Sequence, residues 1–176
     1  MHASPRKSPR IPVNLVLPWG DRAACGQQSV EVTKKKDIPM EIRPYSESDE
    51  TAVAELWREV FPGAPPWNKP ENDIRRKLSV QRELFLVATV GAELVGTAMA
   101  GYDGHRGWVY YVAVGPRHRR RGIGRALMRS VEEKLAHLGC AKLNLQVRAS
   151  NDEVVGFYKK LGYEIEDRIS MAKRLE

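Results

Sequence analysis

A basic stretch rich in arginine and glycine, residues 119–126, has the composition of a phosphate-binding loop. It follows an apolar, strand-like run at 109–114 and leads into an amphipathic helix. Backbone N–H groups at the start of a helix point at a bound anion, and the helix dipole adds partial positive charge. Gly122 and Gly124 carry no Cβ atom, so the backbone can come close to a pyrophosphate, while the arginines supply forked hydrogen-bond donors. The stretch therefore predicts a site for a phosphate-rich ligand.

Two familiar phosphate motifs are excluded by the spacing. The loop lacks the Lys-Ser/Thr ending of a P-loop. It also lacks the three-glycine dinucleotide fingerprint with an acidic residue about 20 positions further on. A plain solvated turn is the alternative interpretation of a basic loop with two glycines, and the elements around the loop argue against it.

The net charge of +7 is concentrated in two segments. Residues 1–39 hold seven Lys/Arg against three Asp/Glu, and residues 117–129 hold six Arg and no acid. A nucleic-acid binder spreads basic side chains along a face and interleaves aromatic residues. Charge focused on one loop suits a single phosphate-rich ligand, so no nucleic-acid partner is expected. Duplex binding by the arginine cluster at 119–121 and the basic tail is the competing interpretation.

The composition, 42% hydrophobic and 29% charged, is that of an ordinary globular protein. No apolar run approaches the roughly 20 residues of a transmembrane helix, so no membrane partner is expected. Cys25 and Cys140 fit no disulfide or metal spacing and are interpreted as reduced thiols of a cytoplasmic protein. The histidines form no ligand cluster, so no metal site is predicted.

The first 39 residues differ from the rest of the chain. Pro5, Pro9, Pro12 and Pro18 interrupt any helix there, and the segment shows no amphipathic period. We therefore predict a disordered basic extension at 1–39 and one folded domain at 40–176. Because the globular pattern begins abruptly at Met40, that residue is also a candidate translation start.

From Met40 onward, strand and helix patterns alternate. Apolar residues recur every four positions after the basic loop, which predicts an amphipathic helix that ends at Gly139. The order β-α-α-β-β-β-α-β-α-β-β predicts an α/β single domain, a mixed, mostly antiparallel sheet flanked by helices. Strands are expected at 40–43, 84–90, 94–102, 109–114, 143–147, 163–165 and 169–172, and helices at 46–61, 71–79, 123–138 and 151–160.

The loop also matches a known signature, Arg/Gln-x-x-Gly-x-Gly/Ala, through Arg119, Gly122 and Gly124. With this motif and the element order, residues 40–175 resemble the Gcn5-related N-acetyltransferases, the GNAT family, and the resemblance implies the acyl-CoA N-acyltransferase fold. Three segments look closer still to the bacterial YpeA-like acetyltransferases. They are Pro66-Trp67-Asn68, the run Gly-Tyr-Asp-Gly-His-Arg-Gly at 101–107, and Leu161-Gly162-Tyr163.

The resemblance implies how acetyl-CoA would be held. A bulge in the 109–114 strand would open a slot for the pantetheine arm and leave a backbone N–H free for the thioester oxygen. Ordinary strand burial is compatible with this role, because the contacts are made by backbone. The implied acetyl-CoA-binding residues are Val112, Ala113, Val114, Arg119, Arg120, Arg121, Gly122, Ile123, Gly124, Arg125 and Asn151.

Tyr158 matches a tyrosine that family members often place in the C-terminal helix, seven residues after an asparagine, here Asn151. The resemblance implies that its hydroxyl protonates the departing thiolate. The pKa of a free thiol is about 8.5 and that of a free phenol is about 10, so a positioned tyrosine can donate a proton to a departing thiolate. Core packing is the alternative for Tyr158. Asn151 is expected to cap the helix, with a contact to the CoA arm as a second role.

The general base stays open. Some protein N-terminal acetyltransferases of the family place a Glu five residues before the asparagine, but this chain has Gln146, which cannot accept the proton. Asp103 and His105 are alternatives, although Asp-Gly is also a strong hairpin-turn signal. Water can carry the proton instead. Trp67 lies where the family frames the acceptor, either as a structural side chain or as a cation-binding face.

The resemblance implies an N-acetyltransferase that uses acetyl-CoA as cosubstrate and transfers the acetyl group to a primary amine by direct attack on the thioester. The acceptor is a small molecule or a protein, and the sequence does not identify it. The oligomeric state is open, with a homodimer among the options. A catalytically weak acyl-CoA sensor with the same fold is the alternative.

Overall fold

The computed structural model describes residues 39–65 and 67–175. Apart from its last residue, the predicted extension at 1–39 lies outside this range. Met40 is the first residue of the first strand among the described residues, and the boundary between 1–39 and 40–176 stays a prediction.

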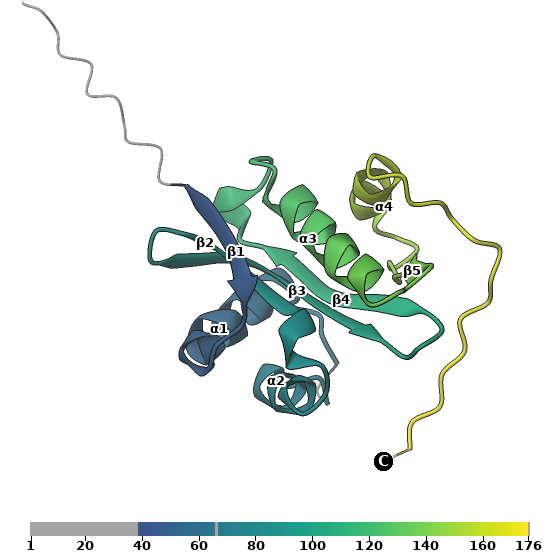
Figure 1. The fold of residues 1–176 in the computed structure, drawn as a ribbon, viewed down its shortest axis with the longest axis horizontal. Helices are drawn as coiled ribbons and strands as arrows, with labels where there is room; N and C mark the ends of the chain where they lie inside the picture. Colours follow the sequence, from purple (N-terminus) through teal and green to yellow (C-terminus); the bar gives the residue numbers. More distant parts are fainter. Residues whose placement is uncertain (1–38, 66, 176) are drawn as a thin grey trace, which may run out of the picture. The chain divides into compact units, whose positions relative to one another are not determined.

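Within the described residues, five strands form one sheet in the order β1-β2-β3-β4-β5 (Figure 1). Strands β1 to β4 pair antiparallel, and β5 lies parallel to β4, so the predicted mixed, mostly antiparallel sheet is confirmed. Gly91, at the predicted hairpin turn between β2 and β3, has a φ of 62°, which favours glycine. The strands are β1 Met40–Pro44, β2 Phe85–Val90, β3 Glu93–Tyr102, β4 Gly107–Val114 and β5 Leu143–Asn144.

Helices cover both faces of the sheet (Figure 1). Because strand side chains alternate in direction, β2 contributes to two separate cores. Phe85 packs in the cluster under the first two helices, while Leu86 packs in the cluster under the third. One face carries α1 Glu50–Val60 and α2 Pro70–Leu78, and the other carries α3 Ile123–His137 and α4 Asp152–Lys159.

Helix α3 is fixed by the apolar period that predicted it. Each of its four-spaced apolar side chains is almost fully buried, and burial of such a side chain stabilises by about 1.5–3 kcal/mol. Gly139 follows the helix with a φ of 78°, as expected for a left-handed terminator. The buried residues are Ile123, Leu127, Val131 and Leu135, at 3%, 0%, 1% and 2% exposure.

The last two predicted strands are wrong. Residues 163–165 and 169–172 form no strand, and the fifth strand covers Leu143–Asn144 rather than 143–147. Alternating polarity indicates which face a strand would bury, but a strand also needs a neighbouring edge in register. Since β5 offers only two residues, side-chain contacts such as Gln146 to Ser170 hold the segment after α4 instead. Ile169 is therefore 90% exposed.

Asp49 joins β1 to the start of α1. Its buried carboxylate accepts two hydrogen bonds from Arg43, at 2.7 and 2.8 Å, and one from the Ser46 backbone N–H at 2.8 Å. The Arg43 hydrogen bonds hold the pKa of Asp49 below its ordinary value. A depressed folded-state pKa means that the stabilisation is present above the unfolded pKa of about 3.9 and is lost as the pH falls through the folded value.

We expect Asp49→Asn to lower the free energy of unfolding by about 2–3 kcal/mol at pH 7, because charged hydrogen bonds are lost. The difference from the wild type should shrink at about pH 2, where the wild-type carboxyl becomes protonated. Urea unfolding at both pH values measures this. Glu47→Gln, which removes an exposed ion pair with Arg82, is the control and should change little. An Asp49→Asn deficit that is the same at both pH values would contradict the assignment.

Candidate functional site

Strand β4 contains a bulge. Thr97 on β3 pairs with Ala113, but Met99 pairs with Tyr110, so three steps along β4 match two steps along β3. At the bulge, Tyr111 has a φ of 49°, a left-handed conformation that a tyrosine rarely adopts. The bulge that the family resemblance implied for this strand is therefore present.

Buried contacts hold the bulge in its strained conformation. The Thr97 hydroxyl donates to the Tyr111 carbonyl at 2.8 Å and accepts from the Trp57 indole N–H at 2.9 Å. The Tyr111 ring stacks on Trp57 with 3.9 Å between centroids. Its hydroxyl donates to Asp73 at 2.6 Å. Strained backbone persists where its surroundings over-determine it, and here the side chain and carbonyl of Tyr111 are both held.

Strands β4 and β5 stop pairing before β4 reaches the bulge. Their parallel pairing covers only Gly107 with Leu143 and Trp108 with Asn144. In the described chain, no strand pairs with this edge of β4 from Val109 to Val114. Val112, Ala113 and Val114 therefore lie on a stretch of backbone that is open on one side, as the slot for a pantetheine arm requires.

The basic loop leads from β4 into the open N-terminus of α3. Arg120 and Gly122 have φ values of 61° and 82°, so the chain turns through left-handed conformations before the helix begins at Ile123. No side chain caps α3, and its first turn holds no acid. A Cβ on Gly122 would meet no described atom within 4 Å, so space is free beside the helix end. Uncapped N–H groups with room in front of them fit a phosphate.

Gly124 has a packing role that the sequence did not indicate. A Cβ atom there would lie 3.2 Å from Cζ of Phe157, on the neighbouring helix α4. The sequence argument placed this glycine only against phosphate. In the structure, the missing Cβ also lets α3 and α4 approach, so substitution of Gly124 tests both roles together.

The loop arginines are exposed and contact the elements around the loop. Arg120 pairs with Glu153 of α4 at 2.6 Å, with both side chains largely solvent-exposed. Arg121 approaches the His118 ring at 3.3 Å, and Arg119 lies 3.5 Å from the Val114 carbonyl. Exposed pairs of this kind contribute little stability, so these guanidinium groups can turn to a phosphate at small cost.

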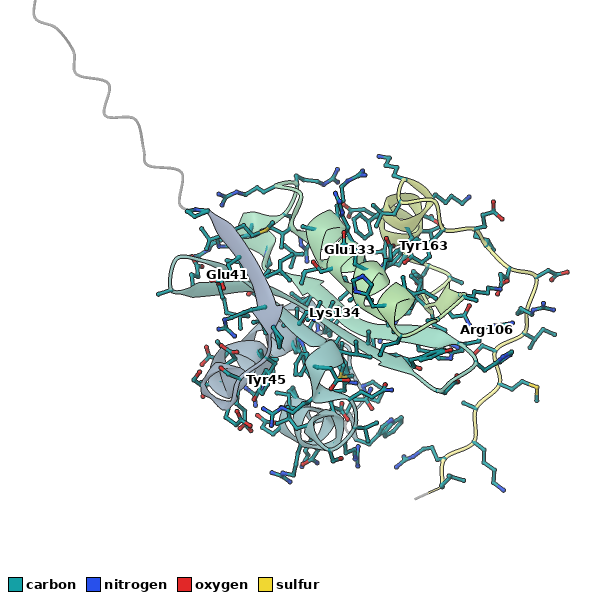
Figure 2. The ribbon with its side chains drawn as sticks, viewed as in Figure 1. Glu41, Tyr45, Arg106, Glu133, Lys134 and Tyr163 are labelled. Carbon is teal, nitrogen blue, oxygen red and sulfur yellow. The ribbon has the colours of Figure 1, made fainter. Side chains whose placement is uncertain are left out.

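Tyr158 lies in the core of the α3 face at 8% exposure. Desolvation raises the pKa of its phenol to about 12, so it keeps its proton across the neutral range. The Tyr163 ring meets it edge-on at 5.6 Å, and Figure 2 shows Tyr163 beside α3 and α4. Asn151 accepts from the Val154 N–H at 3.3 Å, so its predicted capping role is confirmed.

Asp103, one of the two candidate bases of the β3–β4 loop, is engaged in a turn. Asp103 accepts the backbone N–H groups of His105 and Arg106 at 2.7 and 2.6 Å, and those hydrogen bonds lower its pKa. This geometry favours the turn interpretation of Asp-Gly. Trp67, by contrast, does face a cation: the Arg174 guanidinium lies 4.2 Å from its ring centroid.

Sequence reasoning missed three residues that shape the site, namely Thr97, Tyr111 and Asp73. Tyr111 meets Asp73 across 38 positions of chain, a contact that no local pattern predicts. Thr97 left a weak signal, because it is a polar residue within the buried part of a strand, at 0% exposure.

Comparison with known proteins identifies the family. A model of the acetyltransferase (GNAT) family matches residues 50–163. An acetyltransferase of Yersinia enterocolitica is 52% identical over 136 residues, which cover 77% of this chain and 96% of the relative. The chain therefore belongs to the GNAT family of acetyltransferases.

Solved structures share the fold. Ard1 from Thermoplasma volcanium has a TM-score of 0.62 and 27% identity, over 72% of this chain and 84% of the other. The aminoglycoside N-acetyltransferase AAC(6')-Iy, solved in complex with CoA, has a TM-score of 0.66 and 19% identity, over 78% of this chain and 95% of the other. The protein is an acetyl-CoA-dependent N-acetyltransferase, as predicted, and an inactive sensor is not favoured. The YpeA-like subgroup stays a prediction.

In residues 39–65 and 67–175, no helix is long and apolar enough to cross a membrane. The same part of the chain holds no group of three or more His, Cys, Asp and Glu side chains arranged to hold a metal ion.

We expect Thr97→Val to slow turnover more than it weakens acetyl-CoA binding. The substitution keeps the shape of the side chain but leaves the Trp57 indole and the Tyr111 carbonyl without their partner, at a cost of about 1–3 kcal/mol. Relaxation of the bulge would then misplace the backbone N–H that the family resemblance implies for the thioester oxygen. Steady-state kinetics with calorimetric titration of acetyl-CoA tests this, with Thr89→Val on the neighbouring strand as the control. Unchanged kcat in a folded Thr97→Val protein would contradict it.

Proposed function

We propose that acetyl-CoA binds along β4, with its pyrophosphate against residues 119–125 and its thioester at the bulge, and that a primary amine attacks the thioester directly. One observation carries the proposal. The same strand bears the strained bulge at Tyr111 and, at its other end, leads into the uncapped N-terminus of α3. A long ligand with an anionic head and a carbonyl at its tail matches these two features and the open edge between them.

In this arrangement the binding residues act mainly through backbone. Val112, Ala113 and Val114 offer the open edge of β4 to the amide groups of the pantetheine arm. A backbone N–H freed by the bulge would face the thioester oxygen, where negative charge develops during attack. Ile123 and Gly124 contribute N–H groups at the helix end, and the loop arginines supply the counter-charge.

Tyr158 supplies the proton for the leaving thiolate. The reaction forms the amide C–N bond and breaks the C–S bond. A proton leaves the amine nitrogen, and the thiolate takes one from the Tyr158 hydroxyl, which is replenished from water. Burial raises the pKa of this phenol to about 12, so its hydroxyl carries its proton across the neutral range.

An amine must be neutral to attack, and a bound water fits the role of proton carrier best. Gln146 cannot serve as a base, and its side chain donates to Ser170 at 2.6 Å. Asp103 is engaged by two backbone N–H groups. The rate should therefore rise with pH toward the pKa of the acceptor amine.

Calorimetric titration of acetyl-CoA, followed by thiol release with a panel of amines and mass identification of the product, tests the proposed function. Binding in the micromolar range and an acetylated amine would support it. Binding without turnover for every amine would favour the sensor. Salt-steep binding to duplex with no affinity for acetyl-CoA would favour the nucleic-acid alternative.

The folded domain at 40–176 is proposed to carry the whole acetyl-CoA site. We expect a protein lacking residues 1–39 to bind acetyl-CoA as tightly as the full chain, because every residue assigned to the site lies after Met40. Parallel calorimetric titrations measure this, and a truncated protein that folds but binds weakly would contradict it. The cytoplasmic location and the homodimer remain predictions.

A further inference from the structure

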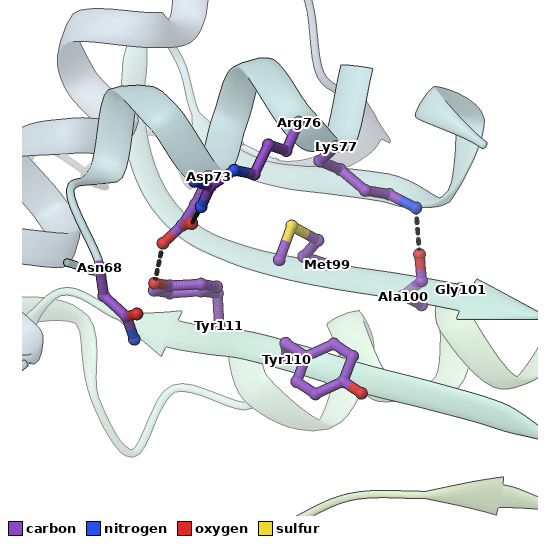
Figure 3. A pocket seen from close by; sticks show the side chains of 9 residues that line it. All are labelled: Asn68, Asp73, Arg76, Lys77, Met99, Ala100, Gly101, Tyr110 and Tyr111. Carbon is purple, nitrogen blue, oxygen red and sulfur yellow. Dashed lines mark hydrogen bonds and ion pairs between the residues drawn. The ribbon is translucent and has the colours of Figure 1, made fainter. Parts of the chain in front are cut away.

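A pocket of 380 Å³ lies between α2 and the bulged part of β4 (Figure 3). It is on the face of the sheet that α1 and α2 cover. Its volume is near the lower end of the range for ligand sites, about 300–1,000 Å³, so it suits a small molecule. It is lined by Asn68, Asp73, Arg76, Lys77, Met99, Ala100, Gly101, Tyr110 and Tyr111.

The bulge connects this pocket to the proposed thioester position. Consecutive side chains of a regular strand point to opposite faces, yet Tyr110 and Tyr111 both line the pocket. The left-handed conformation of Tyr111 breaks the alternation. A ligand in the pocket therefore lies against the residues at which the acyl group is proposed to be presented.

Three charged side chains of α2 line the pocket, namely Asp73, Arg76 and Lys77, and Arg76 is paired with Asp73. Asp73 and Lys77 are four residues apart, so they lie on the same helix face with roughly 5–6 Å between their Cβ atoms. They do not pair with each other. Asp73 accepts from Tyr111 at 2.6 Å and from Arg76 at 3.3 Å, while Lys77 donates to the Ala100 carbonyl at 2.5 Å (Figure 3).

Both groups keep unused hydrogen-bonding capacity. A carboxylate offers about four lone-pair sites, of which two are taken at Asp73. An ammonium has three donors, of which one is taken at Lys77. Asp73 can therefore accept from a ligand ammonium, and Lys77 can donate to a ligand carboxylate. The acidic end is the end that touches Tyr111.

We propose that this pocket is the acceptor site and that it takes a free amino acid, with the ammonium on Asp73 and the carboxylate on Lys77. Because Asp73 contacts Tyr111, an ammonium held by Asp73 lies beside the bulge. Met99 and Tyr110 form an apolar wall that favours an apolar or aromatic side chain. The inference rests on the proposed function, because it requires the thioester at the bulge. Before attack, the ammonium gives one proton to water. The amine then forms the amide C–N bond as the C–S bond breaks, and the thiolate takes its proton from Tyr158 as proposed above.

L-phenylalanine and L-phenylalaninamide are the probes, because the amide lacks the carboxylate. The ammonium of the amide is also more acidic, so kcat/KM is expressed per neutral amine for both. In a thiol-release assay with saturating acetyl-CoA, we expect this kcat/KM for the acid to exceed that for the amide by about tenfold or more, the value of one charged contact. Lys77→Met should raise KM for the acid by a similar factor, leave the amide nearly unchanged and so remove the preference. Arg75→Met, on the exposed side of α2 outside the pocket, is the charge-matched control and should preserve it.

Calorimetry separates this inference from the proposed function. Titration of L-phenylalanine into the CoA-loaded full chain should show binding that Lys77→Met weakens and Arg75→Met does not. If acetyl-CoA binds but the acid and the amide are used equally, or L-phenylalanine at about 1 mM neither binds nor reacts, the acceptor assignment is overturned and the function stands. If the full chain does not bind acetyl-CoA, the proposed function itself fails.

Discussion

Replacing Tyr158 with phenylalanine should slow acetyl transfer by roughly 10²–10⁴-fold, the range for loss of a general acid, while acetyl-CoA affinity stays nearly unchanged. The substitution removes only a hydroxyl, so the ring keeps its packing in the core of the α3 face. The hydroxyl itself supports neither the loop at 119–125 nor the backbone of β4. Rates must be measured with an acceptor for which chemistry limits turnover.

Tyr163→Phe is the matched control. Tyr163 packs edge-on against Tyr158, but its hydroxyl donates to Glu132 of α3 at 2.7 Å. Its loss should lower stability by about 1 kcal/mol and leave kcat unchanged. Because burial raises the pKa of Tyr158 to about 12, removing its hydroxyl should lower the pH–rate curve without moving its midpoints below about pH 10. A Tyr158→Phe enzyme with wild-type turnover would return Tyr158 to a core-packing role.

The parts of the site that the sequence predicted are those set by local rules. The four-residue apolar period indicated α3, and Gly139, which was predicted to end this helix, has the left-handed conformation of a terminator. Asn151 at the start of α4 is a cap of the expected kind. In each case the residue and its physical cause lie within one helical turn of each other.

The features that the sequence did not predict depend on contacts between distant segments. Nothing in the residue type of Tyr111 indicates a positive φ, since a tyrosine prefers extended backbone. The conformation is held by Trp57 and Thr97, which are 40 positions apart in the chain. The same limit explains the wrong strands after α4. Whether a sheet edge is available to pair with residues 163–165 and 169–172 depends on where β5 ends, which their own sequence does not indicate.

Replacing Gly122 with alanine should weaken acetyl-CoA binding by about tenfold or more. With a φ of 82°, the position is unfavourable for any residue with a Cβ, at a cost of about 1–2 kcal/mol. No described atom lies within 4 Å of the added Cβ, so the substitution makes no clash inside the protein. The methyl group would instead occupy the space in front of the helix end that the pyrophosphate is proposed to fill. Calorimetric titration of CoA and acetyl-CoA measures the effect.

Gly139→Ala is the matched control. Gly139 lies just beyond the other end of the same helix, with a φ of 78°, and no described atom lies within 4 Å of a Cβ added there. The two substitutions should cost similar stability, so any difference in acetyl-CoA affinity reports on the ligand rather than on strain. Gly124→Val should also weaken binding, but its contact with Phe157 makes the loss partly one of packing between α3 and α4. If Gly122→Ala and Gly139→Ala lower the melting temperature alike and both bind acetyl-CoA as the wild type does, the phosphate assignment of this loop is wrong. If only Gly122→Ala loses affinity, the anionic end of the ligand lies at the start of α3. The pantetheine arm then extends along β4 and places the thioester at the bulge.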